Sequence, residues 1–251
     1  MSTPIGIQLY TLKDIIYDDF IGTLEKVAAI GYEGVEFAGY GDIPAETMKA
    51  TLDRLSLKAC GSHVSYELLT TDLDAVIKYN KVIENPYVIC PYCKFADKED
   101  VLKKAKEFNF IGKELKKHGI QFGYHNHNHE FEKIDGEFIL DILYKETDPE
   151  FLKAEIDLYW LYYMGVSTVD YIKKYSGRVN LIHLKDMEIE ADGSKNSTEI
   201  GNGVINIKEI SEAAIENKVE WLIVEQEAFK IPSLEAAKID YDNIIKMGLN
   251  K

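Results

Sequence analysis

The sequence predicts a single α/β domain, a (βα)8 TIM barrel spanning residues 1–251. Short apolar or β-branched runs recur at intervals of about 25 to 33 residues, with a longer last interval, and segments of helical periodicity lie between them. A length of 251 residues with 46% hydrophobic residues is sufficient for one large core. Because a helix follows each strand, the strands should be parallel, and eight such units close into a barrel more readily than they form an open sheet.

Eight runs are the expected strands. In chain order they are residues 5–10, 33–37, 57–63, 87–92, 120–125, 153–158, 179–184 and 221–226. The last interval is longer and contains the polar segment 191–197. A doubly wound open sheet is the alternative, but the turn at residues 11–14 lacks the glycine-rich phosphate-binding pattern of a dinucleotide fold.

The clearest expected helix covers residues 99–118. Its apolar stripe, at three- and four-residue steps, consists of Leu102, Ala105, Phe108, Ile111 and Leu115. Gly119 then provides a C-terminal stop. Gly31 provides the same stop after the first expected helix, and Pro44 fits the first turn of the next one.

Composition and charge argue against several classes of function. A net charge of -14 repels polyphosphate backbones, so we expect no nucleic-acid partner. No stretch approaches the roughly 20 apolar residues of a membrane helix, and the N-terminus lacks a basic flank and a cleavage site, so we expect a soluble cytoplasmic protein without a membrane partner. Cys60, Cys90 and Cys93 fit a reducing compartment, and the Cys90-x-x-Cys93 pair is expected to pack at a strand end.

Polar residues gather where the expected strands end. They include Glu36, His63, the run His125-Asn126-His127-Asn128-His129-Glu130, Glu155, Asp157, His183, Lys185, Asp186, Glu225 and Glu227. In (βα)8 barrels the active site lies at the C-terminal strand ends. Converging carboxylates repel one another, so a bound cation is the economical explanation. Carboxylate and imidazole ligands without thiolate suit Mn²⁺, Mg²⁺, Co²⁺ or Zn²⁺, and we favour Mn²⁺.

The order of these motifs resembles the xylose-isomerase-like barrels known as sugar phosphate isomerase/epimerase. The motifs are residues 31–36, 124–127 followed by Glu130-Phe131, 155–157, 183–186, 201–203 and 224–226. The resemblance implies one metal held by Glu, Asp, His and Glu from the last four strands. Asp157, His183 and Glu225 match the second, third and fourth ligands. Many relatives carry a Glu where this chain has His125, so Glu130 is the expected first ligand and His125 the reserve.

The resemblance and the residue types together predict proton transfer on a sugar or keto-sugar through a metal-stabilised enediolate. The expected catalytic residues are Glu130, Glu225 and His127. The expected substrate contacts are Glu36, His63, His125 and Lys185. The expected activity is isomerisation or epimerisation of a small carbohydrate.

Other interpretations stay open at this level. The same enediolate could expel a β-substituent, which would make the protein a dehydratase or lyase. Because His125 replaces an expected Glu, the chain could also be a catalytically silent carbohydrate-binding barrel. A metal-dependent endonuclease is disfavoured by the acidic charge. Residues 201–203 are a weak candidate for phosphate binding, and an exposed aromatic surface could support a homodimer.

Overall fold

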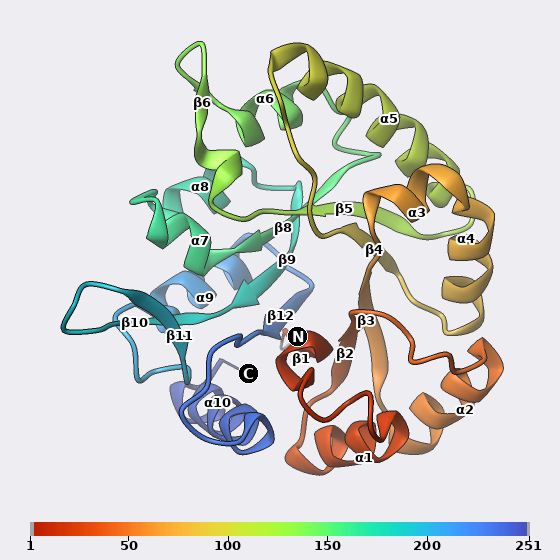
Figure 1. The fold of residues 1–251 in the computed structure, drawn as a ribbon, viewed down its shortest axis with the longest axis vertical. Coiled ribbons are helices and arrows are strands. Elements are labelled where there is room, and N and C mark those ends of the chain that lie inside the picture. Colours follow the sequence, from red (N-terminus) through yellow and green to blue (C-terminus); the bar gives the residue numbers. More distant parts are fainter. Residues whose placement is uncertain (1–2, 250–251) are drawn as a thin grey trace.

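The computed structural model describes residues 3–249 and shows a closed barrel of eight parallel strands (Figure 1). The strands are β1 (Ile5–Gln8), β2 (Gly34–Phe37), β3 (Lys58–His63), β4 (Tyr87–Cys90), β5 (Gln121–His125), β8 (Lys153–Asp157), β9 (Val179–Leu184) and β12 (Trp221–Val224). Neighbours in sequence are neighbours in the barrel, and β12 pairs with β1 to close it. The predicted TIM-barrel fold is confirmed, with every expected strand in its place.

Helices surround the barrel on its outside (Figure 1). They are η1 (Leu9–Leu12), α1 (Phe20–Ile30), α2 (Ala45–Leu55), α3 (Tyr66–Thr71), α4 (Leu73–Val82), α5 (Lys98–Lys116), η2 (His129–Phe131), α6 (Ile139–Lys145), α7 (Leu158–Tyr163), α8 (Thr168–Lys174), α9 (Ile207–Glu216) and α10 (Ser233–Met247). Helix α1 ends at Gly31, whose φ of 119° needs the freedom of glycine. Helix α5 buries Ala105, Phe108 and Ile111 from the predicted stripe.

Two hairpins interrupt the alternation of strands and helices. β6 (Lys133–Ile134) pairs with β7 (Glu137–Phe138), and β10 (Asp186–Ile189) pairs with β11 (Lys195–Thr198). The second hairpin accounts for the longer last interval of the sequence. It follows β9 after Lys185 alone and projects from the barrel (Figure 1). The residues after β9 are therefore held by their own small sheet as well as by the barrel.

The barrel interior changes from apolar to polar along its axis. A separate apolar cluster of buried side chains comprises Cys60, Tyr87, Ile89, Leu181, Trp221 and Ile223. Cys90 and Cys93 are buried and free, as their expected packing role requires. Closer to the C-terminal strand ends the buried side chains are charged or polar instead. The ionisable groups therefore lie nearer the C-terminal strand ends than this apolar cluster does.

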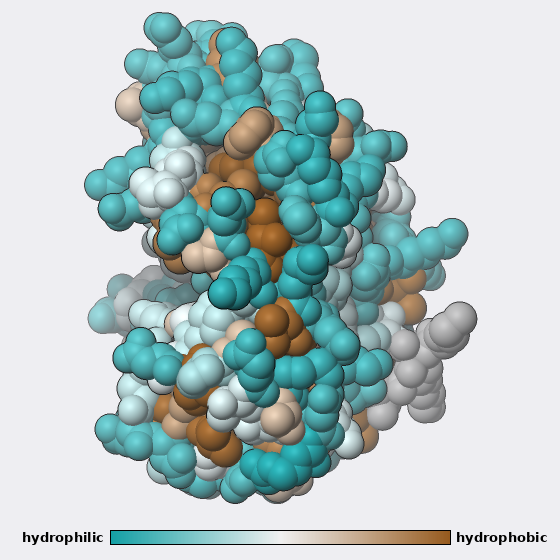
Figure 2. All heavy atoms as spheres, turned by 90° about the vertical axis from the view of Figure 1, so that its right-hand side faces the viewer, coloured by the Kyte–Doolittle hydropathy of each residue, from teal (hydrophilic) through white to brown (hydrophobic). Residues whose placement is uncertain are grey.

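The face of the molecule in Figure 2 is mostly hydrophilic. Hydrophobic side chains are exposed on it in a stripe over the upper half and the centre and in smaller patches in the lower part and toward the right. Within residues 3–249, no helix combines the length and the apolar character that crossing a membrane requires. The N-terminal segment that is expected to lack a cleavage site includes residues 1 and 2, which lie outside the described part of the chain.

Candidate active site

Four buried side chains at the C-terminal strand ends form what we call the rim group: His125, Asp157, His183 and Glu225. One ligand atom from each lies within 4.8 Å of the others. His125 and Asp157 end β5 and β8, His183 is the penultimate residue of β9, and Glu225 follows β12. The strand register brings them level, since Asp157 pairs with His183 and His183 with Ile223.

Contacts within the rim group provide hydrogen-bond partners for only some of its polar atoms. His183 Nδ1 lies 3.2 Å from Glu225 Oε2, and His125 Nε2 lies 3.9 Å from Asp157 Oδ2. Asp157 Oδ1 accepts the backbone N–H of Tyr159 at 2.8 Å at the start of α7. Asp157 Oδ2 has no hydrogen-bond partner among residues 3–249. One carboxylate oxygen is therefore fixed by the helix while the other faces the rim group.

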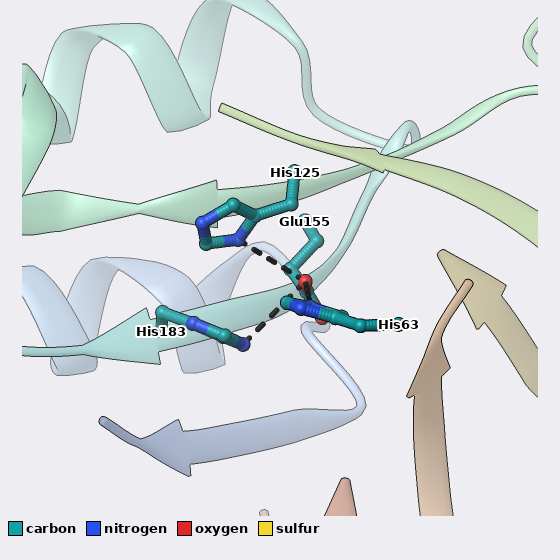
Figure 3. A group of neighbouring side chains, drawn as sticks. All are labelled: His63, His125, Glu155 and His183. Carbon is teal, nitrogen blue, oxygen red and sulfur yellow. Dashed lines mark hydrogen bonds and ion pairs between the residues drawn. The ribbon is translucent and has the colours of Figure 1, made fainter. Parts of the chain in front are cut away.

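A second group, which we call the deep group, consists of His63, His125, Glu155 and His183 (Figure 3). Glu155 Oε2 lies 2.8 Å from His63 Nε2, 3.2 Å from His125 Nδ1 and 3.4 Å from His183 Nε2. Glu155 precedes Asp157 by two residues on β8, so both side chains point to the same side of the strand. His125 and His183 belong to both groups.

Glu36 on β2 extends the deep group. Its Oε2 lies 2.7 Å from His183 Nε2 and 3.3 Å from His63 Nε2, and it accepts a hydrogen bond from Gln8 Nε2 at 2.8 Å. A Cβ added to Gly61 would overlap Glu36 Oε1 and lie 3.1 Å from its Cδ. A glycine at position 61 therefore makes the room that the Glu36 side chain occupies.

Lys185 provides a buried positive charge beside the rim group. Its Nζ lies 3.5 Å from Glu225 Oε2 and 3.9 Å from Asp157 Oδ2, and it donates to Glu227 Oε1. The ammonium also lies 5.3 Å from the ring centroid of Trp160. Burial disfavours the charge, but Glu225 and Asp157 raise the pKa of Lys185, so it stays protonated.

The carboxyl groups titrate very differently from one another. Burial is the largest effect on Asp157 and Glu155, and it raises the pKa of each to about 7. Burial also acts against the charge of Glu225, but Lys185 and His183 hold the pKa of Glu225 well below its usual value. Burial disfavours a charged ring at His63, yet Glu36 and Glu155 raise the pKa of His63 to about 10.

The donor set fits a divalent cation. Glu36 Oε1, Glu155 Oε1, Asp157 Oδ2 and His125 Nδ1 are buried without a hydrogen-bond partner within residues 3–249. Buried carboxylates without partners are costly, and a cation would offset that cost. Imidazole nitrogens and carboxylate oxygens within 4.8 Å of one another are ligands that Mn²⁺, Co²⁺ and Zn²⁺ accept.

The structure does not bring Glu130 into either group. Glu130 lies in η2, where its carboxylate accepts from Tyr124 Oη at 2.6 Å and from the backbone N–H of His127 at 2.8 Å. Burial raises its pKa. The side chain that lies beside Asp157 in the rim group is His125, the reserve of the sequence analysis.

The remaining predicted residues take distinct places. The ring of His127 lies 5.0 Å from that of His125 and 5.6 Å from that of Trp160, measured between centroids. Its Nδ1 has no partner within the described chain, and burial lowers its pKa to about 4. His63 and Glu36, expected as substrate contacts, lie in the deep group instead of on an open surface.

The sequence analysis placed Glu155 at a strand end but gave it no role. The sequence feature that could have identified Glu155 is its spacing from Asp157. Residues two apart on a strand place their side chains on the same side of it. Which side faces the barrel interior depends on packing against the helices. Glu155 therefore becomes a candidate site residue only when Asp157 is known to face the barrel interior.

The loop at residues 201–203 has a structural explanation. The Asp186 carboxylate accepts the backbone N–H groups of Gly201 at 2.9 Å, Gly203 at 3.1 Å and Ile205 at 3.1 Å. Met187 N–H donates to the same side chain. These amides hold the loop against the start of β10, so they are not free for a phosphate.

Comparison with known proteins gives a consistent assignment. A family model described as xylose isomerase-like TIM barrel matches residues 24–246. A structure of a sugar phosphate isomerase/epimerase from Parabacteroides distasonis is 26% identical, covers 98% of this chain and 99% of that one, and has a TM-score of 0.86.

Two further proteins are similar to this chain, one over part of its sequence and one in its fold. An inosose dehydratase from Clostridium tetani is 28% identical over 138 residues, which is 49% of this chain and 46% of the relative, so the match spans about half of each. The structure of an IolI protein with a bound zinc atom has a TM-score of 0.77 at 14% identity, with 97% of each chain covered, and at that identity it shows a shared fold alone.

Proposed function

This chain belongs to the xylose isomerase-like TIM barrel family, and we propose that it is a metal-dependent isomerase or epimerase acting on a sugar or keto-sugar. The observation that carries the proposal is the rim group, in which two carboxylates and two imidazoles converge at the barrel mouth. The likeness to a sugar phosphate isomerase/epimerase at 98% coverage supports the class of reaction. Small carbohydrates are the proposed substrates.

We assign the metal to His125, Asp157, His183 and Glu225, with Mn²⁺ favoured and Mg²⁺, Co²⁺ or Zn²⁺ as alternatives. When bound, the cation supplies positive charge that stabilises the enediolate left when a proton leaves the carbon beside a carbonyl. Lys185 is the buried ammonium beside Asp157, Glu225 and Glu227, and Asp157 Oδ2 is buried without a hydrogen-bond partner among residues 3–249. A dication at the rim group would supply a partner for that oxygen.

Side chains of this protein would then transfer the protons and bind the substrate oxygens. Glu225 is present in its ionised form because its pKa is held low, and we assign to it the acceptance of the proton from substrate carbon. His127 is neutral at pH 7, and its unpartnered Nδ1 can exchange a proton with a substrate hydroxyl. Lys185 is a charged donor for a substrate oxygen. Glu130 fixes the backbone at His127 and thereby the direction of that ring.

A dehydratase is the second candidate, favoured by the partial match to inosose dehydratase. Both reactions begin with removal of a proton beside a carbonyl. They differ in whether the enediolate is reprotonated or loses a hydroxyl group from the β-carbon as water. The residues of the rim group can serve either course, so product analysis separates them.

The test combines metal content with hydrogen exchange. Protein made without a histidine tag is analysed for metals by mass spectrometry, then incubated with Mn²⁺ and a panel of keto-sugars in heavy water. We expect about one metal per chain and deuterium at the carbon beside the carbonyl. Glu225→Gln should abolish the exchange, whereas Glu220→Gln, which removes an exposed carboxylate just before β12, should not.

Each outcome decides between candidates. Deuterated sugar with all oxygens retained supports the isomerase or epimerase. Loss of water with deuterium in the product supports the dehydratase. Metal binding without exchange on any sugar would leave a carbohydrate-binding barrel and refute the proposed function.

A further inference from the structure

We propose that Glu36 and Glu155 are positioning residues that fix the orientation and tautomer of the two histidine metal ligands, His183 and His125. The inference rests on the proposed metal function and deepens it. It assigns to the deep group a task other than binding the ion. Each shared histidine presents one ring nitrogen to the rim group and the other to a carboxylate below it.

His183 shows the arrangement most clearly. Its Nε2 lies 2.7 Å from Glu36 Oε2, and its Nδ1 lies 3.2 Å from Glu225 Oε2. If Nε2 carries the proton and donates to Glu36, Nδ1 keeps its lone pair for a metal. The opposite tautomer would leave Glu36 facing a lone pair. The carboxylate of Glu36 therefore selects the tautomer that can bind an ion beside Glu225.

The two ring nitrogens of His125 also face different carboxylates. Its Nδ1 lies 3.2 Å from Glu155 Oε2, and its Nε2 lies 3.9 Å from Asp157 Oδ2. The contact with Glu155 is at ion-pair distance but does not have hydrogen-bond geometry. The nitrogen nearer Asp157 is then the one left for the metal.

The two carboxylates are themselves held from several sides. His63 bridges them, with its Nε2 at 2.8 Å from Glu155 Oε2 and 3.3 Å from Glu36 Oε2. Gln8 donates to Glu36 at 2.8 Å, and its own side-chain oxygen accepts the Tyr10 N–H at 3.0 Å. Glu36 and Glu155 are fully buried. Such a layer can hold the imidazoles because its members cannot swing into solvent.

A ring nitrogen cannot serve both groups at once. An ion bound to the ring nitrogens that face Glu36 and Glu155 would lie in the deep group. Asp157 and Glu225 would then not be ligands of that ion. The rim location is favoured because Asp157 ends β8 and Glu225 follows β12, so both lie nearer the mouth of the barrel than Glu155 does. Partners of metal-bound histidines typically change metal affinity by about 10–100-fold when removed.

The experiment measures Co²⁺ binding to metal-free protein by competition with a chelator and by the visible spectrum of bound cobalt. The variants are Glu36→Gln, Glu155→Gln, Asp157→Asn and, as a matched control, Asp240→Asn, which alters a buried carboxyl group contacted by Ile200 instead of by either group. We expect the first two to bind one Co²⁺ with the wild-type spectrum but about 10–100-fold more weakly. Asp157→Asn should change the spectrum or abolish binding, and the control should match the wild type.

Three results would overturn the inference. Unchanged affinity in both Glu36→Gln and Glu155→Gln would show that neither positions a ligand. A spectrum altered by Glu155→Gln and unaltered by Asp157→Asn would place the ion in the deep group. Wild-type protein that binds no Co²⁺ would refute the metal function as well, and that outcome is distinct because it needs no variant. Circular dichroism of each variant separates weaker binding from loss of fold.

Discussion

Alanine at position 61 would disturb the deep group without replacing any titratable residue. Gly61 lies on β3, and an added Cβ would overlap Glu36 Oε1 and lie 3.1 Å from Cδ and 3.2 Å from Cγ. The Glu36 side chain is fully buried, so it cannot move into solvent. It would have to give up its contacts with Gln8 and His183, which lie 2.8 Å and 2.7 Å away.

The cost can be worked from these contacts. Overpacking a well-filled core costs about 1–3 kcal/mol, and a lost hydrogen bond to a charged group costs about 1.5–3 kcal/mol. Since part of the strain is relieved when the contacts break, we expect Gly61→Ala to lower the free energy of unfolding by about 3 kcal/mol. For a chain of this size that corresponds to a fall of roughly 6–12 °C in Tm. Metal affinity should also fall about tenfold or more.

Two companion variants make the assay specific. In Gly123→Ala the new Cβ on β5 meets Cδ1 of Ile89, the end of a side chain that can rotate, so we expect a loss of about 1 kcal/mol and unchanged metal affinity. In a Glu36→Ala background the Gly61→Ala change should cost much less, because its opposing carboxylate is gone. Urea unfolding and chelator competition give both quantities. Equal costs of Gly61→Ala in the two backgrounds would refute the reasoning.

Three other predictions concern separate regions. Burial raises the pKa of Asp240 to about 8, so the folded state keeps this proton up to that pH, whereas the unfolded chain releases it near pH 4. The stability that this proton contributes should therefore be full below about pH 4 and fall as the pH rises to about 8. At about 1.4 kcal/mol per pKa unit this amounts to about 5 kcal/mol, which Asp240→Asn should remove from the pH dependence in urea titrations; an unchanged pH dependence would contradict it. Asp186→Ala leaves the Gly201 and Gly203 amides without their acceptor, so hydrogen exchange at residues 201–205 should accelerate at a cost of about 2 kcal/mol, and unchanged protection would argue against the loop assignment. Lys185→Met should slow substrate exchange about tenfold or more while Co²⁺ binds as tightly or more tightly, because a positive charge 3.5 Å from Glu225 Oε2 is removed; weaker binding would contradict the role.

The barrel and its polar rim were predictable from the sequence because both depend on local pattern. The eight apolar runs needed only strand length, helical periodicity and the stops at Gly31 and Gly119. The prediction extended several strands too far at their C-terminal ends; β4 stops at Cys90 and β12 at Val224. Those extra residues follow the strands toward the rim, where backbone pairing ends and side chains turn to the site.

The two hairpins and the ends of the helices could not be predicted from local sequence patterns. Strands β6 and β7 are two residues each and depend on the turn at Gly136, and β10–β11 depends on a polar segment without apolar alternation. Helix α5 was predicted to reach residue 118, but it ends at Lys116, and residues 117–119 form the turn before β5. Such ends are decided by capping contacts that periodicity does not report.

The sequence by itself determined that Asp157, His183 and Glu225 lie at neighbouring strand ends, because strand order and the two-residue period of side chains are properties of the chain. Only the tertiary structure decided that His125 joins them while Glu130 does not. Glu130 lies in a loop after β5, and its direction is set by the Tyr124 hydroxyl and the His127 amide. The same holds for Glu155 and Glu36, whose partners lie 28 to 147 residues away in the sequence. The room for the Glu36 side chain also depends on the missing side chain of Gly61.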